Sequence, residues 1–112
     1  MKKIEAIIRP EKLDEVRNAL KKAGCVGLMI SEIEGYGRQE GLVQQWRGEK
    51  YKIELIPKIK IEIVVKDKDV ENIIMSIVNS AKTGEIGDGK IFISNIENAI
   101  RIRTEERGEK AI

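Results

Sequence analysis

The chain has 112 residues, 41% of them hydrophobic and 36% charged, a balance that supplies one hydrophobic core and argues against intrinsic disorder. Lys and Arg number 21 against 19 Asp and Glu, so net charge gives no general attraction to nucleic acid or to an anionic membrane. The chain has no histidine and one cysteine, Cys25, which excludes His-dependent nucleophiles, His-ligated zinc sites and a disulfide within the chain.

The first third of the chain predicts a strand, a helix and a second strand. Residues 3–9 are β-branched and partly alternating, and Pro10 closes this strand. Apolar residues recur every three or four positions over 13–23, which predicts an amphipathic helix that Gly24 stops. Residues 26–34 predict a second strand ended by Gly35, and Cys25 before it is expected to be a buried apolar residue.

Residues 36–54 are polar and contain three glycines, which predicts a loop long enough to be functional. Residues 58–65 alternate strictly, which predicts a strand with Ile59, Ile61, Ile63 and Val65 on one face. Residues 70–81 predict a second amphipathic helix that Asp69 can cap. A glycine-rich loop over 82–90 and short strands at 91–94 and 100–103 complete the chain.

This order of elements predicts an α+β fold, the ferredoxin-like βαββαβ sandwich, with an antiparallel sheet and both helices on one face. The strands are apolar enough that we expect other subunits to cover the second face, in a closed homo-oligomer. No signal-peptide core and no apolar run of membrane-spanning length occurs, so a cytoplasmic protein is expected.

The glycine-rich loop contains the string G-x-x-x-x-G-K, from Gly84 to Lys90, which phosphate-binding P-loops share. Its context differs, because Ile91 replaces the Ser or Thr that holds Mg²⁺ and the loop joins a helix to a strand in the reverse order. A P-loop ATPase is therefore excluded. The loop is either an anion site, built from the amides around Gly87 and the Lys90 charge, or a turn that needs glycine for positive φ.

Three further features suit anions. Arg101 and Arg103 are two residues apart on the last expected strand, so they share a side while Ile100 and Ile102 face the core; the alternative is a solvated edge strand. The segment 35–39 is a flexible turn that carries an arginine. Lys58, at the start of its strand, is either a solvated charge or a receptor for a carboxylate.

Several of these motifs, in one order and along the whole chain, resemble the PII nitrogen regulatory signal-transduction proteins; the most specific are residues 35–39, Tyr51, 57–62, 83–92 and 101–104. The resemblance implies one PII-type domain over 1–112 that assembles as a homotrimer with nucleotide sites between subunits. It also implies an effector loop, the T-loop, over 37–55 between the second and third strands, a phosphate-binding loop over 82–90 and a C-terminal strand segment over 100–104.

The resemblance assigns site residues by position. ATP or ADP is expected to bind Met29, Gly37, Arg38, Gln39, Val64, Gly87, Asp88, Gly89, Lys90, Arg101 and Arg103, with both arginines supplied by the adjacent subunit. Gln39 is expected to ligate Mg²⁺ through an oxygen, as that ion prefers. The expected 2-oxoglutarate site comprises Gln39, Glu40, Gly41, Lys58 and Gly87.

The resemblance also implies a function carried by partners. Arg47 and Tyr51 lie in the loop that would dock onto an ammonium transporter, glutamine synthetase or another nitrogen-metabolism regulator, with no nucleic acid and only indirect membrane contact. Tyr51 is either a site of uridylylation or an unmodified contact. Two departures are Met29, where the family usually has Thr, and Glu105, where it usually has Gly.

The expected function is therefore that of a non-catalytic sensor of ATP, ADP and 2-oxoglutarate. A slow ATPase is the alternative, with Glu62 as the one plausible general base. A metal-tolerance trimer of the same fold would need more metal ligands than a chain without histidine supplies.

Overall fold

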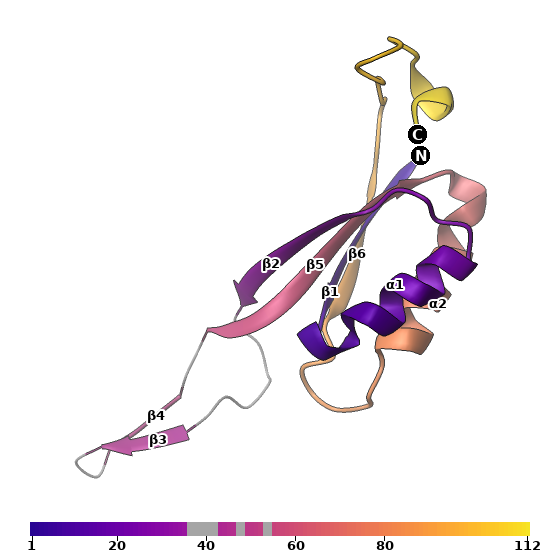
Figure 1. The fold of residues 1–112 in the computed structure, drawn as a ribbon. Coiled ribbons are helices and arrows are strands. Elements are labelled where there is room, and N and C mark those ends of the chain that lie inside the picture. The colour runs from indigo at the N-terminus through magenta and orange to yellow at the C-terminus, as the bar shows by residue number, and fades with distance from the viewer. Residues whose placement is uncertain (36–42, 47–48, 53–54) are drawn as a thin grey trace.

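The computed structural model describes residues 1–35, 43–46, 49–52 and 55–112, and it describes side chains in 1–35 and 55–112. Its main sheet has the strand order β2-β5-β1-β6, and every neighbouring pair is antiparallel. The strands are β1 (Lys2–Ile8), β2 (Met29–Gly35), β5 (Ile56–Val65) and β6 (Lys90–Asn95), and the helices are α1 (Leu13–Lys22) and α2 (Val70–Ala81). Both helices cover the same face of the sheet (Figure 1), which confirms the predicted ferredoxin-like α+β fold.

The core lies between this helix layer and the sheet. Alternate residues of β1 and β5 face it, and one stripe of each helix closes it, as the two periodicities predict. Val65 packs against the core only partly buried, as do Cys25 and Leu28. The fully or nearly fully buried side chains are Ile4, Ala6, Ile8, Val16, Leu20, Ile59, Ile61, Ile63, Ile73, Ile77 and Ala81.

Short 3₁₀ helices begin or extend the helical segments. They are η1 (Pro10–Lys12) before α1, η2 (Asp67–Asp69) before α2 and η3 (Gly108–Ala111) near the C-terminus. The expected cap by Asp69 is wrong, because its side chain makes no capping hydrogen bond and its backbone already has helical angles at the end of η2. Helix α1 ends as predicted, since Gly24 takes a φ of +86° just beyond it.

Strand β2 begins later than predicted. Val26 is fully exposed, and pairing with β5 starts only at Met29 opposite Glu62. Residues 25–28 connect the helix layer to the edge of the sheet, and no strand among the described residues pairs with them.

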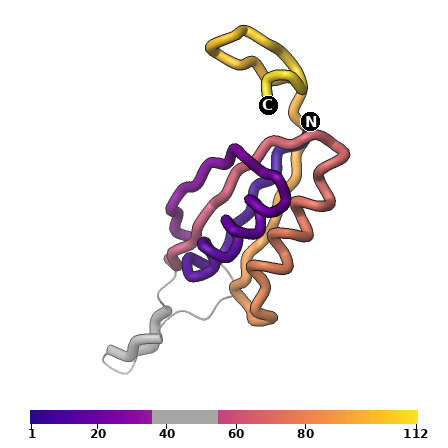
Figure 2. The backbone as a smooth tube through the Cα atoms, turned by 45° about the vertical axis from the view of Figure 1, so that its right-hand side comes forward, coloured from indigo at the N-terminus to yellow at the C-terminus, as the bar shows by residue number. Residues whose placement is uncertain are grey.

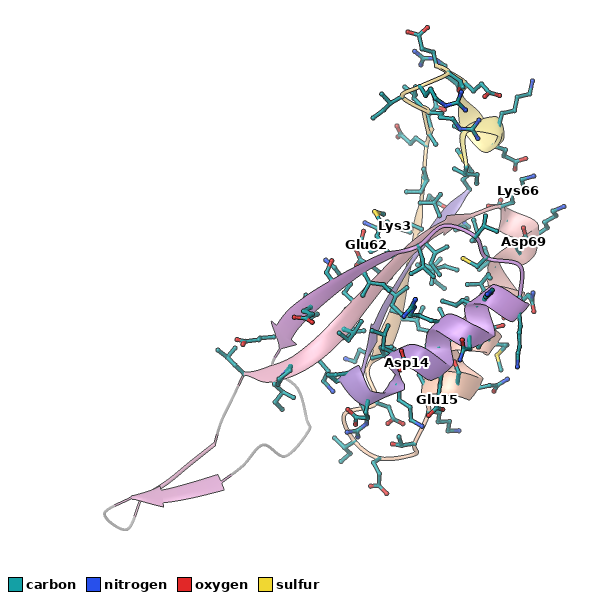
Figure 3. The ribbon with its side chains drawn as sticks, in the orientation of Figure 1. Lys3, Asp14, Glu15, Glu62, Lys66 and Asp69 are labelled. Atoms are coloured by element: carbon teal, nitrogen blue, oxygen red, sulfur yellow. The ribbon has the colours of Figure 1, made fainter. Side chains whose placement is uncertain are left out.

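The sheet face opposite the helices has a charged centre. Lys3 Nζ lies 3.1 Å from Glu5 and 3.2 Å from Glu62, and Lys60 Nζ lies 3.3 Å from Glu62. Figure 3 shows Lys3 and Glu62 together on this face. The apolar part of the face is at its flanks, where Met29 and Phe92 lie in the row of Glu5 and Glu62 and are each more than half exposed.

Part of the segment expected to be a loop is a hairpin. Strands β3 (Val43–Trp46) and β4 (Glu49–Lys52) pair antiparallel in a separate two-stranded sheet. Only two residues separate the strands, a spacing typical of hairpins, and the segment includes strand-favouring Val, Trp and Tyr residues. The prediction of a loop over 36–54 was therefore wrong for the eight residues of these two strands.

The predicted strand over 100–103 is also wrong. Ile100 forms an isolated bridge with Arg107, residues 102–104 form a turn, and Arg101 N donates to Glu106 O at 2.9 Å. Ile102 is 96% exposed and does not face the core. This segment leaves the sheet after β6 and projects past its end (Figure 2), so it has no strand of the main sheet to join.

Candidate functional site

The glycine-rich loop joins α2 to β6 and lies against the end of β1. Gly84, Gly87 and Gly89 have φ values of +91°, +104° and +105°, so the predicted need for positive φ is confirmed. At Gly89 there is also no room for a side chain, because a Cβ would lie 1.7 Å from the carbonyl oxygen of Ile7. Glycine therefore allows this loop to touch the backbone of β1.

Asp88 holds the loop together. Its carboxylate accepts hydrogen bonds from Thr83 N at 2.8 Å, from Gly84 N at 2.9 Å and from the Thr83 hydroxyl. Arg9 Nε donates to the same carboxylate at 3.1 Å. These bonds, that of the Thr83 hydroxyl first, hold the pKa of Asp88 well below its usual range. Since the loop uses both side-chain oxygens, Asp88 can offer a phosphate only its backbone N–H.

Lys58 lies beside this loop, at the start of its strand. Its ammonium donates a hydrogen bond to the carbonyl oxygen of Gly87. Burial, and next the guanidinium of Arg9, lower the pKa of Lys58. The structure thus brings the expected carboxylate receptor against the expected phosphate loop, with a second cation close by.

Arg9 was missed by the sequence analysis, which treated it only as the last residue of a strand. The pairing of β1 with β5 ends at Ile8 opposite Ile59, so Arg9 and Lys58 are the next residues at the same edge. The signal was available in the predicted topology, because antiparallel neighbours place the end of one strand beside the start of the other.

The expected effector segment leaves the sheet at this same edge. Gly35 pairs with Ile56, and Ile33 pairs with Lys58, so residues 36–55 depart and return within two residue pairs of Lys58. The expected ligand residues Gly37, Arg38, Gln39, Glu40, Gly41 and the tip residue Arg47 lie outside the described residues. Tyr51 lies in β4, and its side chain is outside the described part.

The two C-terminal arginines lie far from this site in the same chain. Strand β6 begins at the glycine loop, and the segment that carries Arg101 and Arg103 lies beyond the other end of the sheet (Figures 1 and 2). Arg101 is held there by Glu106 at 2.8 Å and by the carbonyl of Lys110 at 2.9 Å. One chain therefore does not bring both arginines to its own glycine loop.

Met29 and Val64, which the family resemblance assigns to nucleotide binding, lie on the open sheet face. Met29 pairs with Glu62, and Val64 pairs with Lys3. Val64 is six residues from Lys58 on β5, which corresponds to about 20 Å along the strand. Lys90 is exposed at the first position of β6. Of the expected residues with described side chains, Lys58, Gly87, Asp88, Gly89 and Lys90 therefore gather at one edge.

Other groups in the described part offer little chemistry. Glu62, the candidate general base, is paired with Lys3 and Lys60, whose hydrogen bonds lower its pKa and make it a weaker base. Among residues 1–35 and 55–112, no three His, Cys, Asp or Glu side chains are grouped to hold a metal. No helix in the described ranges is long and apolar enough to cross a membrane.

A cavity of about 360 Å³ adjoins the glycine loop on the helix side. Its wall is mostly apolar, with Ile74, Ile77 and Val78 from α2 and Ile91 and Ile93 from β6, and Lys82 and Lys90 lie at the loop end. An apolar wall offers a phosphate no hydrogen-bond donor, so a phosphate in this region would have to bind the glycine-rich loop.

Comparison with known proteins shows the family of the chain. The family described as Nitrogen regulatory protein P-II matches residues 1–106. A protein named Nitrogen regulatory protein P-II 2 from Methanothermobacter thermautotrophicus is 58% identical over 112 residues, which are 100% of this chain and 97% of that protein. Proteins named Nitrogen regulatory protein P-II from Synechocystis sp. and Rhizobium meliloti are 54% and 53% identical over 112 residues, 100% of each chain. The chain therefore belongs to the P-II family of nitrogen regulatory proteins.

Proposed function

We propose that this P-II protein senses ATP or ADP together with 2-oxoglutarate and reports them to target proteins through residues 37–55. The observation that carries the proposal is the contact between Lys58 and the carbonyl of Gly87. It joins a cation suited to a carboxylate with a loop suited to phosphates, at the edge where the effector segment leaves the sheet. Ligands at this edge can therefore bias the conformation of that segment.

In this proposal the phosphates lie on the backbone amides of the glycine loop and on Lys90. Gln39 supplies an oxygen to Mg²⁺, and Lys58 pairs with a carboxylate of 2-oxoglutarate. The protein acts by binding and not by catalysis. Its targets are an ammonium transporter, glutamine synthetase or another nitrogen-metabolism regulator, and it works in the cytoplasm.

The proposal includes a homotrimer, because the site is incomplete in one chain. The segment that carries Arg101 and Arg103 lies at the opposite end of the sheet from the glycine loop (Figures 1 and 2), so only a neighbouring copy can bring these arginines to the phosphates. The apolar flanks of the open sheet face, with Met29 and Phe92, suit contact with such copies.

Calorimetry tests the sensing function. ATP is titrated with Mg²⁺ in the presence and absence of 2-oxoglutarate, and the reverse titration follows. If the two ligands share this site, each should raise the affinity for the other by the same factor, as linkage requires. The Lys90→Ala variant should lose most of the ATP affinity, whereas Lys21→Ala, on the exposed face of α1, should not. ATP binding with no effect of 2-oxoglutarate would remove the roles of Gln39 and Lys58.

A further inference from the structure

Arg9 contacts the glycine loop at two places, although the proposed function assigns it no role. Its side chain is only 13% exposed and reaches from the end of β1 into the loop. Nε donates to Asp88 Oδ1 at 3.1 Å, and Nη2 donates to the carbonyl oxygen of Ile86 at 2.9 Å. The planar guanidinium of Arg9 therefore binds a carboxylate and a main-chain carbonyl of the same loop at once.

These contacts fix the direction of two peptide groups. The carbonyl of Ile86 points to Arg9, and the carbonyl of Gly87 points to Lys58. In a planar trans peptide the C=O and the following N–H point in opposite directions, and the chain has no cis peptide bond. The N–H groups of Gly87 and Asp88 are therefore turned away from the two cations. Residues 86–87 form a turn, and within the described residues the N–H of Gly87 donates no hydrogen bond.

Arg9 also compensates a charge that would otherwise oppose a phosphate. The carboxylate of Asp88 is needed inside the loop, where it binds the N–H groups of Thr83 and Gly84. A phosphate on the amides of Gly87 and Asp88 would lie close to that negative charge. The guanidinium of Arg9, bonded directly to the carboxylate, offsets the repulsion.

We infer that Arg9 is a positioning residue of the phosphate loop, acting through Asp88 and the carbonyl of Ile86. The inference rests on the proposed nucleotide function. Arg9 need not touch the nucleotide. It keeps the loop amides turned outward and neutralises the carboxylate behind them, and with Lys58 it connects the carboxylate site to the phosphate site.

The first test compares two arginine variants by calorimetry with Mg²⁺-ATP. Arg9→Gln should weaken ATP binding about tenfold or more, because it removes charge-assisted bonds and leaves Asp88 uncompensated. Arg17→Gln is the matched control, since Arg17 is exposed on α1 and its one ion pair within the described residues is with Asp14, at 3.8 Å. This variant should bind ATP as the unaltered protein does. The ATP affinity of Arg9→Lys should lie between those of the other two variants. A lysine keeps the positive charge, but its ammonium lacks the forked guanidinium that bonds to both acceptors.

A double-mutant cycle distinguishes positioning from direct contact. If Arg9 acts through Asp88, Arg9→Gln should cost less affinity in an Asp88→Asn background than in the unaltered chain. In the ligand-free protein, the NMR amide signals of Gly87 and Asp88 should shift in Arg9→Gln while that of Ile61, in the core, stays in place.

The outcomes separate the two proposals. If the unaltered protein does not bind ATP, the proposed function fails, and with it the inference. If the unaltered protein and Arg9→Gln bind ATP equally well, only the inference fails. An equal affinity loss in both backgrounds, or unshifted loop amides, would also overturn it.

Discussion

Replacing Gly89 with alanine tests whether the loop depends on its contact with β1. A Cβ at this position would lie 1.7 Å from the carbonyl oxygen of Ile7, whereas an ordinary contact is about 3.5 Å. The loop would therefore have to move by nearly 2 Å. Such overpacking costs about 1–3 kcal/mol, and the φ of +105° adds roughly 1–2 kcal/mol for any residue with a side chain.

The Gly84→Ala variant is the matched control. Gly84 also has a positive φ, of +91°, but a Cβ there would meet nothing within 4 Å. Only the conformational cost of roughly 1–2 kcal/mol applies to it. Gly89→Ala should therefore be the less stable of the two by about 1–3 kcal/mol.

Urea denaturation of both variants at one protomer concentration measures this difference, because assembly makes apparent stability depend on concentration. A thermal melt should show a further loss of roughly 4 °C for each kcal/mol in a domain of this size. Gly89→Ala should also bind Mg²⁺-ATP more weakly than Gly84→Ala, since only the first displaces the loop from β1. Equal stability of the two variants would refute the close contact.

Three further predictions follow from single residues. Lys58→Ala should weaken 2-oxoglutarate binding and largely spare ATP in calorimetry; equal losses of both in a folded protein would contradict the role of Lys58 as a carboxylate receptor. Glu105 has a φ of +61°, so Glu105→Gly should relieve roughly 1 kcal/mol of backbone strain. The gain is measured as slower hydrogen exchange of the Gly108 amide, which donates to the carbonyl of Ala99. The pKa of Asp88 is lowered in the folded protein, so its stabilisation is present above the ordinary aspartate pKa near 3.8 and is lost as pH falls below it. In urea denaturation at pH 7, Asp88→Asn should therefore have a lower free energy of unfolding than the unaltered chain, and this difference should become smaller toward pH 3. A difference that becomes larger in acid would show that the ionised carboxylate of Asp88 does not stabilise the fold.

Local patterns predicted most of the fold. Alternation in β5 placed Ile59, Ile61 and Ile63 on the buried face, and the spacing in α2 placed Ile73 and Ile77 there as well. These predictions succeed because a strand repeats every two residues and a helix every 3.6, whatever lies elsewhere in the chain. The same patterns gave the order of elements and therefore the antiparallel sheet.

The errors occurred where pairing depends on distant residues. Ile100 and Ile102 alternate with arginines as a strand would, yet their segment lies beyond the sheet and Ile102 is exposed. Val26 has a strong preference for strands, but it is fully exposed and pairs with no strand among the described residues. Propensity describes what a residue favours, whereas a strand exists only where another strand can pair with it.

By itself the sequence determined the two periodicities, the glycine-rich loop and the family resemblance, since each depends on residues close together in the chain. Only the tertiary structure decided what the loop does with its charges. Arg9 and Asp88 are 79 residues apart, and Lys58 reaches Gly87 from a third segment. The register of β1 with β5 and the path of the loop across the end of β1 bring these groups together. Such contacts are set by how the elements pack and by no local pattern.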